Sequence, residues 1–454
     1  METLQRTANR GSVSTGYDVD NSCKFEDANS EAMVKSLSSQ SRDCFTISFW
    51  LKRTSLGASR LCGAGPDGNN EVIIHFTSSN ELEIYSWEGA YAMRYKTNRV
   101  FRDTSAFYHF AFLIDTRLST ASERTQIYVN GVLETSFSVS VVPGQNSLLD
   151  WTTNIQVGRG GPAADADMSG YLAEFVYLDD TKAAHTDLGE FDSNTGIWKP
   201  KDVSGLTFGT NGAYLDFKDS SNMGNDANGG TDFSLTNITA ADQATDTCTN
   251  NFCTWSPLWV YATNRTISEG GTKLTGSSAW GGCKGSIGVT NGKWYWENKA
   301  SGNDTIIGWQ TDGDGNIYSG NAHNVLDTIG LYQDGNYIWI KDSTSGRNDT
   351  SASGSNASGQ IIGFALDLDS SPQTATFYRN GSAIASDVNI DGLTGKTLFP
   401  FISQYNQNTE ANFGGYTSFT ISSSASDGNG YGTFEYAPPS GYYAICTKNL
   451  AEYG

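Results

Sequence analysis

Apolar and polar residues alternate along much of the 454-residue chain, with the period of two that a half-buried β-strand shows. Residues 45–51 are the clearest case, because Ile47, Phe49 and Leu51 fall on one face of the strand. Further runs of this kind in the first half are 71–76, 81–87, 90–95, 107–115, 126–129, 154–158 and 169–178. Together these runs predict a β-sandwich over residues 22–180.

One hairpin signature occurs twice. Residues 126–131 (Gln-Ile-Tyr-Val-Asn-Gly) and 376–381 (Thr-Phe-Tyr-Arg-Asn-Gly) both place Asn-Gly after a strand-like run. Asn-Gly favours a type I′ turn, because both central residues of that turn have positive φ. An apolar strand, 107–115 or 361–369, precedes each hairpin. The recurrence predicts an all-β fold of two tandem jelly-roll β-sandwiches, the second over residues 259–454.

Three other segments lack the alternation. Residues 1–21 are polar and contain glycine, so we expect an extended N-terminal arm. Residues 181–258 alternate short apolar anchors with turn residues, which indicates a connector packed on the first domain. Residues 342–359 are rich in Ser, Gly, Asn and Thr and predict a mobile loop.

Composition and charge narrow the range of functions. The 50 Gly, 22 Tyr, 22 Phe and 11 Trp suit an all-β protein. With 49 acidic and 29 basic residues the net charge is −20, which argues against a nucleic-acid partner, since phosphate binding needs clustered Lys and Arg. The chain has no apolar run long enough for a membrane span and no signal-peptide stretch in residues 1–11, so we expect neither membrane insertion nor ordinary secretion. Its seven scattered cysteines predict free, buried thiols in a protein made in a reducing cytoplasm.

The first half contains, in this order, the segments Phe45-Thr-Ile-Ser-Phe-Trp-Leu-Lys52, Tyr108-His-Phe-Ala-Phe112, Ile127-Tyr-Val-Asn-Gly131, Ile155-Gln-Val-Gly158 and Gly170-Tyr-Leu-Ala-Glu-Phe175. Taken together, they resemble the concanavalin-like, laminin-G-like lectin domain. The resemblance covers roughly residues 22–180 and implies a lectin-like sandwich.

The second half contains a further ordered set of segments, Gly292-Lys-Trp-Tyr-Trp-Glu297, Ile307-Gly-Trp309, Gly363-Phe-Ala-Leu-Asp-Leu-Asp369, Thr376-Phe-Tyr-Arg-Asn-Gly381, Phe399-Pro-Phe401 and Asn412-Phe-Gly414. Together these segments resemble a SPRY domain, and the match is closer than that of the first half. Gln360 departs from the family pattern, which usually has an acidic residue there. Ligands of SPRY modules are usually met by loops at one end of the sandwich, which here implies the segments around Trp280, Tyr318 and Tyr405.

Residues 9–22, 214–219, 246–254 and 438–450 resemble segments of structural proteins of marine tailed phages, which carry an arm, a laminin-G-like domain, a connector and a SPRY domain in this order. The resemblance implies a bacteriophage virion protein, a tail or head fibre or a decoration, made in the host cytoplasm. The arm would attach to other virion proteins, and the sandwiches would present lectin-like surfaces to a host glycan or protein. We expect a homo-oligomer, for which a trimer fits a fibre, because repeated weak contacts gain strength by avidity.

The sequence contains only part of the carboxylate pattern that a glycoside hydrolase needs. A glycoside hydrolase needs two carboxylates across a cleft, and the strand signature is three acids at i, i+2 and i+4. Glu81 and Glu83 are followed by Tyr85, and the pair Glu190 and Asp192 is followed by Asn194. We therefore interpret these acids as solvated strand carboxylates, predict no enzymatic activity, and keep a polysaccharide depolymerase as the alternative function.

Nucleophilic and metal chemistry have equally little support. The four histidines are solitary, with no Ser or Cys nucleophile in their sequence neighbourhood. Asp312–Asn316 alternates oxygen ligands like a calcium loop, but Ile317 replaces the required glycine and His323 the final glutamate. Asp165 and Asp167 could hold calcium, but no second cluster supports them. We predict no metal and no cofactor.

Aromatic residues point to binding instead. In the run 81–87, Leu82 and Ile84 share one face, and Glu83, Tyr85 and Trp87 share the other. Aromatic rings stack on pyranose rings and carboxylates accept sugar hydroxyls, so this face is our candidate glycan site. We expect Tyr91 and Tyr95 of the next run to extend it, and Tyr337 and Trp339 form a similar pattern in the second half.

Two alternatives stay open for these aromatic residues. They would pack under a loop or against a neighbouring subunit if the face is covered. The whole protein would then be a ligand-free structural component of a capsid or tail.

Overall fold

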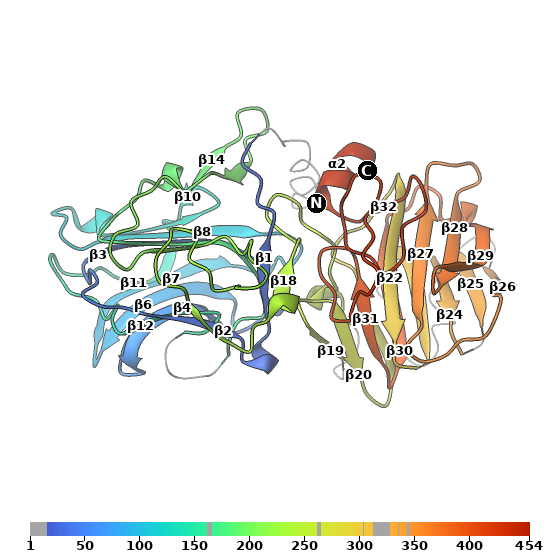
Figure 1. The fold of residues 1–454 in the computed structure, drawn as a ribbon, viewed down its shortest axis with the longest axis horizontal. Coiled ribbons are helices and arrows are strands. Elements are labelled where there is room, and N and C mark those ends of the chain that lie inside the picture. Colours follow the sequence, from blue (N-terminus) through green and yellow to red (C-terminus); the bar gives the residue numbers. More distant parts are fainter. Residues whose placement is uncertain are drawn as a thin grey trace. The chain divides into compact units, whose positions relative to one another are not determined.

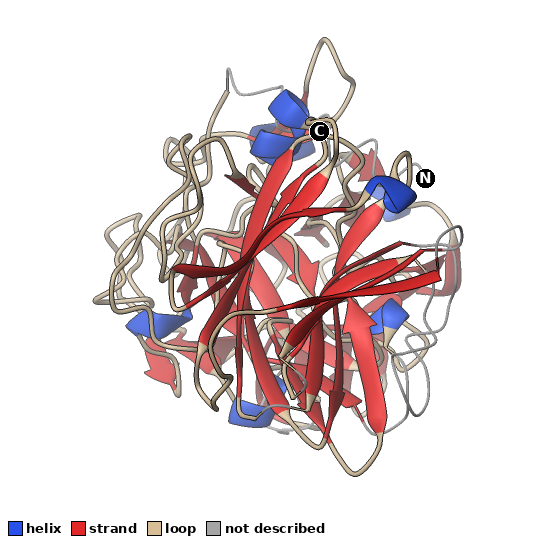
Figure 2. Cartoon of the chain, turned by 90° about the vertical axis from the view of Figure 1, so that its right-hand side faces the viewer, coloured by secondary structure: helices blue, strands red, loops and turns tan. Residues whose placement is uncertain are grey.

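The structure, a computed structural model, describes residues 16–160, 166–260, 265–302, 304–311, 327–334, 336–342 and 346–454. The described chain divides into two compact units, residues 16–249 (the first unit) and 250–454 (the second unit). Strands dominate both units (Figures 1 and 2), and the predicted all-β fold is confirmed. The helical elements in these ranges are η1 (Asp27–Asn29), η2 (Ala121–Glu123), η3 (His185–Asp187), η4 (Ala240–Asp242), η5 (Pro257–Trp259), η7 (Asp391–Leu393) and α2 (Thr447–Tyr453). Across the described residues, none of these helices is long and apolar enough to cross a membrane.

Two eight-stranded antiparallel sheets make up the first unit. Sheet 1 has the order β10-β9-β8-β3-β13-β1-β18, with β16 also paired to β13. Its strands are β1 (Ser22–Phe25), β3 (Cys44–Arg53), β8 (Tyr108–Asp115), β9 (Thr125–Val129), β10 (Val132–Leu133), β13 (Gly170–Asp179), β16 (Ala213–Leu215) and β18 (Gln243–Ala244).

Sheet 2 has the order β11-β7-β6-β5-β4-β12-β2-β17. Its strands are β2 (Ala32–Ser36), β4 (Ser59–Asp67), β5 (Asn70–Phe76), β6 (Glu81–Glu88), β7 (Tyr91–Val100), β11 (Phe137–Val141), β12 (Asn154–Val157) and β17 (Ser234–Thr236). A separate two-stranded sheet joins β14 (Gly189–Phe191) to β15 (Trp198–Pro200).

The core of the first unit lies between sheets 1 and 2. Ile47, Phe49 and Leu51 of β3 belong to it, as their alternation predicts, and they share one cluster with Ile74 of β5 and Ile84 of β6. The two sheets therefore form a sandwich around a common apolar interior.

Residues 181–249 cover the other face of sheet 1. Val176 and Leu178 of β13 pack there against Leu188, Val203 and Phe208. This explains why β13 is buried along its whole length rather than on alternate residues.

Buried ion pairs join the same segment to the sheets. Lys52 of β3 contacts Asp246 at 2.7 Å, and Lys35 of β2 contacts Asp226 at 2.8 Å. Strands β16 and β18 extend sheet 1 and β17 extends sheet 2, so residues 181–249 belong to the same compact unit as residues 22–180.

The second unit also has two sheets. One has the order β19-β20-β31-β22-β27-β28-β29, with β32 paired in parallel to β22, and the other has the order β21-β30-β23-β24-β25-β26. The strands of the first are β19 (Arg265–Ser268), β20 (Lys273–Gly276), β22 (Lys293–Ala300), β27 (Ile361–Asp367), β28 (Thr374–Arg379), β29 (Ser382–Asn389), β31 (Asn408–Asn412) and β32 (Tyr443–Ala444). Those of the second are β21 (Trp280–Lys284), β23 (Thr305–Thr311), β24 (Thr328–Tyr332), β25 (Tyr337–Asp342), β26 (Gly346–Ser351) and β30 (Leu398–Tyr405).

Both predicted Asn-Gly hairpins are present. Asn130 and Gly131 connect β9 to β10 with φ of 49° and 75°, and Asn380 and Gly381 connect β28 to β29 with φ of 47° and 77°. Two successive positive φ angles are the signature of a type I′ turn. The local sequence therefore determined both turns correctly.

Two predictions differ from the structure. Residues 346–351 form β26, which pairs with β25, so the loop predicted over 342–359 is partly a strand. The polar composition of this segment does not indicate a strand, because pairing with β25 is what stabilises it. In the predicted arm, the described residues are 16–21, and Val19 among them is buried and hydrogen-bonded to Thr249.

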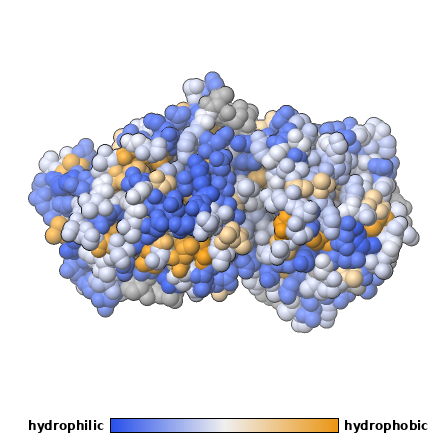
Figure 3. Space-filling model, in the orientation of Figure 1, coloured by the Kyte–Doolittle hydropathy of each residue, from blue (hydrophilic) through white to orange (hydrophobic). Residues whose placement is uncertain are grey.

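All seven cysteines are buried thiols outside any disulfide bond, as predicted. The face drawn in Figure 3 is mostly hydrophilic, with hydrophobic residues in scattered patches. Scattered apolar residues of this kind are normal on a protein surface.

Candidate functional site

The candidate glycan face lies on the side of sheet 2 that points away from the core. Leu82 and Ile84 of β6 are buried in the core, whereas Glu83, Tyr85 and Trp87 point to the opposite side. This is the orientation that the alternation along β6 predicts.

Tyr91 and Tyr95 lie on opposite faces of sheet 2, so the prediction that both extend the site is wrong for Tyr95. Trp87 pairs with Tyr91 but Ser86 pairs with Met93, which inserts one extra residue into β7. A β-bulge of this kind reverses the alternation beyond it. Tyr95, opposite Ile84, is therefore buried in the core.

Three aromatic rings form a cluster on this face. Tyr91, whose side chain is 37% exposed, stands edge-on to Trp87 at a centroid distance of 4.7 Å and to Tyr85 at 5.8 Å. The guanidinium of Arg94 lies 4.3 Å from the centre of the Tyr91 ring. The edge-to-face contacts with Trp87 and Tyr85 and the cation–π contact with Arg94 fix the orientation of the Tyr91 ring. We call Tyr85, Trp87 and Tyr91 the aromatic cluster.

Glu83 sits between two hydrogen-bonding partners, His75 and Arg94. His75 Nε2 lies 3.1 Å from one carboxylate oxygen, and Arg94 Nε donates to the other. Burial raises the pKa of Glu83, but the hydrogen bonds from His75 and Arg94 outweigh it and leave the pKa below its usual value. Glu83 is thus held ionised and oriented by its neighbours.

Glu71 of β5 is a second carboxylate on the face, opposite Trp87 in the register. It is only 4% exposed, and its Oε1 accepts the Tyr85 hydroxyl at 2.8 Å. Its Oε2 is buried and accepts no hydrogen bond from the described parts of the chain. An unsatisfied buried acceptor is costly, so a donor that reached it would be bound favourably.

Sequence analysis did not identify Glu71, His75 or Arg94. Glu71 and His75 share a face of one strand, and that spacing is visible in the sequence. Their placement beside Tyr85 and Glu83 depends on the register of β5, β6 and β7, which alternation alone does not specify.

Four predicted residues of the second unit, Trp280, Tyr337, Trp339 and Tyr405, lie on one face of its six-stranded sheet. Trp280 of β21 pairs with Tyr405 of β30, with ring centres 6.2 Å apart. Tyr337 of β25 contacts Tyr332 at 5.4 Å. Trp339 follows on the same strand but is only 1% exposed, packed with Ile306 and Phe401, so its prediction as an accessible contact is wrong.

The resemblance to SPRY domains implied loops around Trp280 and Tyr405, yet Trp280 lies in β21 and Tyr405 in β30. Tyr318 lies outside the described residues.

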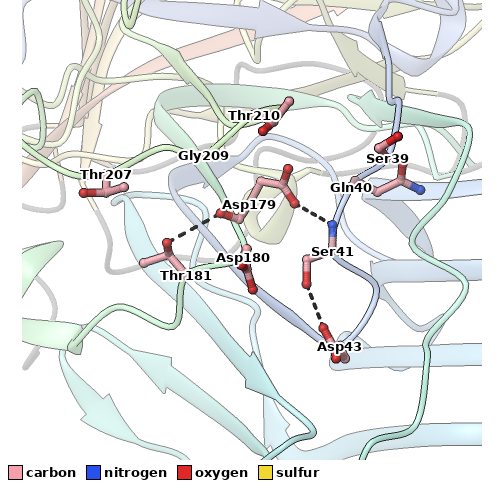
Figure 4. A pocket seen from close by; sticks show the side chains of 10 residues that line it. All are labelled: Ser39, Gln40, Ser41, Asp43, Asp179, Asp180, Thr181, Thr207, Gly209 and Thr210. Carbon is pink, nitrogen blue, oxygen red and sulfur yellow. Dashed lines mark hydrogen bonds between the residues drawn. The ribbon is translucent and has the colours of Figure 1, made fainter.

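An open pocket of about 520 Å³ lies at one end of the first sandwich (Figure 4). Asp179 at the end of β13 accepts the backbone N–H of Ser41 at 2.8 Å and the side-chain amide of Asn211 at 2.8 Å. Ser41 in turn donates its hydroxyl to Asp43 at 2.8 Å. The pocket is polar and its central carboxylate is saturated by neighbouring donors. The lining residues are Ser39, Gln40, Ser41, Asp43, Asp179, Asp180, Thr181, Thr207, Gly209 and Thr210.

The acids considered for hydrolysis are engaged with neighbours. Glu81 accepts the Thr77 hydroxyl at 2.7 Å, and Glu190 and Asp192 share Lys199 at 3.2 and 3.6 Å. The pKa values of Glu83 and Asp192 lie below their usual values, the opposite of the raised pKa that the acid of a glycoside hydrolase needs.

The structure does bring one histidine to a serine, contrary to the sequence-based expectation. Nε2 of His109 lies 2.8 Å from the hydroxyl of Ser48, and Nδ1 of His109 accepts the indole N–H of Trp198 at 3.0 Å. An indole can only donate, so Nδ1 carries the lone pair and Nε2 the proton. Burial lowers the pKa of His109 to about 3. His109 therefore donates to Ser48 and cannot act as its base.

Metal-ligand geometry is lacking in the described ranges, where no group of three His, Cys, Asp or Glu residues converges. Asp167 contacts Arg159 at 3.0 Å. Asp165 and the calcium-like segment 312–323 lie outside the described residues.

Comparison with known proteins supports the domain content. The sequence profile of the "Concanavalin A-like lectin/glucanases superfamily" (Laminin_G_3) matches residues 26–185, as the resemblance of residues 22–180 implied. No curated protein matches the chain.

Similar solved structures include domains LG4-5 of the mouse laminin alpha1 chain, with 8% identity, coverage of 93% of this chain and 95% of that chain, and a TM-score of 0.32. The SPRY domain of human HERC1 has 20% identity, coverage of 35% and 96%, and a TM-score of 0.27. The SAP-like pentraxin from Limulus polyphemus has 11% identity, coverage of 49% and 98%, and a TM-score of 0.31. Laminin-G-like and SPRY domains are thus both among the proteins this chain is similar to.

Proposed function

We propose that the protein is a non-enzymatic, carbohydrate-binding attachment protein that contacts glycan through the outer face of sheet 2. The observation that carries this proposal is the aromatic cluster beside Glu71 and Glu83. A lectin-type fold alone does not specify a ligand, so the residues of the face bear the argument.

The face has both elements of sugar recognition. The exposed ring of Tyr91 and the half-buried rings of Tyr85 and Trp87 offer apolar surfaces for the C–H face of a pyranose. The carboxylates of Glu71 and Glu83 offer fixed acceptors for hydroxyl groups.

Local charge favours a neutral or amino sugar over an acidic one. Arg94 is engaged by Glu83, and Lys96 lies 3.9 Å from Glu81. Acids also lie close together at the Trp87 end of β6. Burial is the largest cause that raises the pKa of Asp150 there, and the negative charge of Glu88 is the second. In the described part of the face, the cations are already paired with acids. A carboxylated or sulfated glycan would therefore be repelled by this negative charge.

A glycan array that contains neutral, amino and acidic oligosaccharides tests the proposal, with calorimetry on any ligand found. Trp87→Ala and Tyr91→Ala should each weaken binding about tenfold or more, as the loss of ~1.4 kcal/mol of stacking would. Trp259→Ala is the matched control, since Trp259 is an exposed indole of the second unit. Binding that is unaffected by both cluster variants would place the ligand elsewhere.

We further propose that the protein is a component of a bacteriophage particle. The support is the resemblance of residues 9–22, 214–219, 246–254 and 438–450 to phage structural proteins. The N-terminal residues would dock on other virion proteins, and a homo-oligomer, for example a trimer, would multiply weak glycan contacts. Immuno-electron microscopy of purified particles with antibody against the chain tests this placement; unlabelled particles would rule it out.

A further inference from the structure

Lys24 of β1 is a buried lysine on the outer face of sheet 1. Its neighbours Cys23 and Phe25 belong to the core of the first unit, so the side chain between them points to the opposite face. That side chain is only 1% exposed. A buried ammonium group persists only where charged or polar partners engage it.

Two buried carboxylates contact this ammonium group. Nζ of Lys24 lies 2.8 Å from Oε1 of Glu31 and 2.8 Å from Oδ1 of Asp242. The two acidic side chains are 2% and 8% exposed. Asp242 comes from a distant part of the chain, because β18 pairs with β1 in a register that, continued by one residue, places Asp242 opposite Lys24. One amine and two carboxyl groups therefore meet in a site that is nearly closed to water.

The two carboxylates are held in different ways. Oδ2 of Asp242 accepts the backbone N–H and the hydroxyl of Thr239, at 2.8 and 3.1 Å. Two donors on that oxygen would stabilise negative charge that develops there. Oε2 of Glu31 is buried and has no hydrogen-bond partner among the residues that the structure describes, and burial raises the pKa of Glu31. A carboxyl group in these surroundings can take up a proton and return it.

We propose that Lys24 and Asp242 form an intramolecular amide bond between their side chains, with Glu31 as the proton carrier. This inference goes beyond glycan binding, because it concerns a covalent modification of the first unit and does not involve the aromatic cluster. The bond would link β1 to the segment that leads into β18, the first and the last strand of the described first unit. The fold itself holds the three reacting groups in contact, as such a reaction requires.

The reaction balances without any further reactant. One proton of the Lys24 ammonium passes to Oδ1 of Asp242, which leaves a neutral amine beside a carboxylic acid. Nζ then attacks Cγ of Asp242, so that the N–C bond forms and the electron pair of the C=O bond moves to Oδ2. Glu31 carries a second proton from Nζ to Oδ1, the Cγ–Oδ1 bond breaks, and Oδ1 departs as water. The amide keeps the third proton, and Glu31 ends in the state in which it began.

Burial favours the reaction. An ammonium and a carboxylate lose their hydration in this site, so the neutral amine and acid cost less there, relative to the ions, than they do in water. The reverse reaction consumes a water molecule, which reaches these buried side chains with difficulty. The amide also removes the buried charges of Lys24 and Asp242 altogether.

A second buried pair of the first unit provides an internal comparison. Lys35 contacts Asp226 at 2.8 Å and also donates to the backbone carbonyl of Gly212 at 3.1 Å. A backbone carbonyl cannot carry a proton from the amine to the departing oxygen. We therefore expect Lys35 and Asp226 to remain an ion pair.

Mass spectrometry of the denatured full chain tests the bond. We expect the wild type to be lighter than its sequence mass by one water molecule. Lys24→Arg keeps the positive charge but should show no loss of water, and comparison of the two proteins cancels any processing of the chain ends. Protease digestion of the wild type should yield one branched peptide, in which Lys24 is joined to Asp242.

Two further variants make the result specific. Glu31→Gln leaves both bonded residues in place but removes the proton carrier, so the bond should form about a hundredfold or more slowly and fresh protein should keep its full mass. Lys35→Arg is the matched control and should lose water like the wild type. A wild type of full sequence mass, or a branched peptide that joins other residues, would overturn the proposal even if a variant failed to fold. Loss of water that persists in fresh Glu31→Gln would also contradict it.

Discussion

Trp198 donates its indole N–H to Nδ1 of His109 at 3.0 Å and thereby decides which nitrogen of the imidazole carries the proton. The contact joins β15, which belongs to residues 181–249, to β8 in sheet 1. It turns what could have been a serine–histidine pair into a structural hydrogen bond from His109 to Ser48. Stability at acid pH depends on the same contact.

We expect His109 to stay neutral to about pH 3 in the folded protein, against about 6.5 when unfolded. The unfolded state therefore binds a proton first, and the free energy of unfolding falls as the pH drops from 6.5 toward 3, by at most ~1.4 kcal/mol per unit. NMR titration of the His109 ring checks the pKa. Urea unfolding of wild type and His109→Gln at pH 7 and 4.5 checks the sign; equal losses in both proteins would contradict it.

Gly131→Ala should destabilise the first unit strongly. Gly131 has φ of 75°, and a Cβ there would overlap the Trp198 ring, so both strain and a steric clash apply. We expect a loss of roughly 2–4 kcal/mol in the free energy of unfolding. Gly57→Ala is the matched control, because its φ is 98° but a Cβ would meet nothing within 4 Å, so strain alone should cost about 1–2 kcal/mol. Denaturant unfolding of both variants measures these losses. Equal losses of unfolding free energy in Gly131→Ala and Gly57→Ala would contradict a steric clash with Trp198.

Lys52→Met should leave Asp246 as a buried charge without its 2.7 Å partner. Removal of one member of a buried ion pair typically costs about 3–5 kcal/mol. The double variant Lys52→Met, Asp246→Leu should recover most of the loss, since no isolated charge then remains. Lys199→Met, which breaks a partly exposed pair with Glu190, should cost less than about 1 kcal/mol. Thermal melts of the four proteins compare these losses.

We expect the protein to bind glycan without cleaving it. Glu83 is paired with Arg94 and has a pKa below its usual value, and Glu190 is paired with Lys199. Purified host polysaccharide should therefore yield no new reducing ends on incubation with the protein. Release that disappears in Glu83→Gln or Glu190→Gln would instead establish a depolymerase.

Much of the fold could be predicted because its signals are local. Alternation identified β3 and the inward side of β6, and Asn-Gly identified two turns whose φ angles only a few residues adopt readily. Strand β26 was not predicted, because its stability comes from pairing with β25. The polar composition of β26 itself does not indicate that pairing.

The candidate site could be predicted only in part. Tyr85 and Trp87 were found because a single strand orients them. Tyr95 was misplaced, since one inserted residue in β7 reverses its face, and Trp339 was taken as accessible although packing with Phe401 buries it. Glu71 and Arg94 were missed because cross-strand register brings them to the aromatic cluster.

The sequence by itself determined strands, turns and the inward side of each strand, because these depend on residues a few positions apart. Tertiary structure alone decided the tautomer of His109, the partners of Glu83 and the pairing of Lys24 with Asp242. Each of these depends on a side chain from another part of the chain, and the electrostatic cost of burial arises only when the two meet.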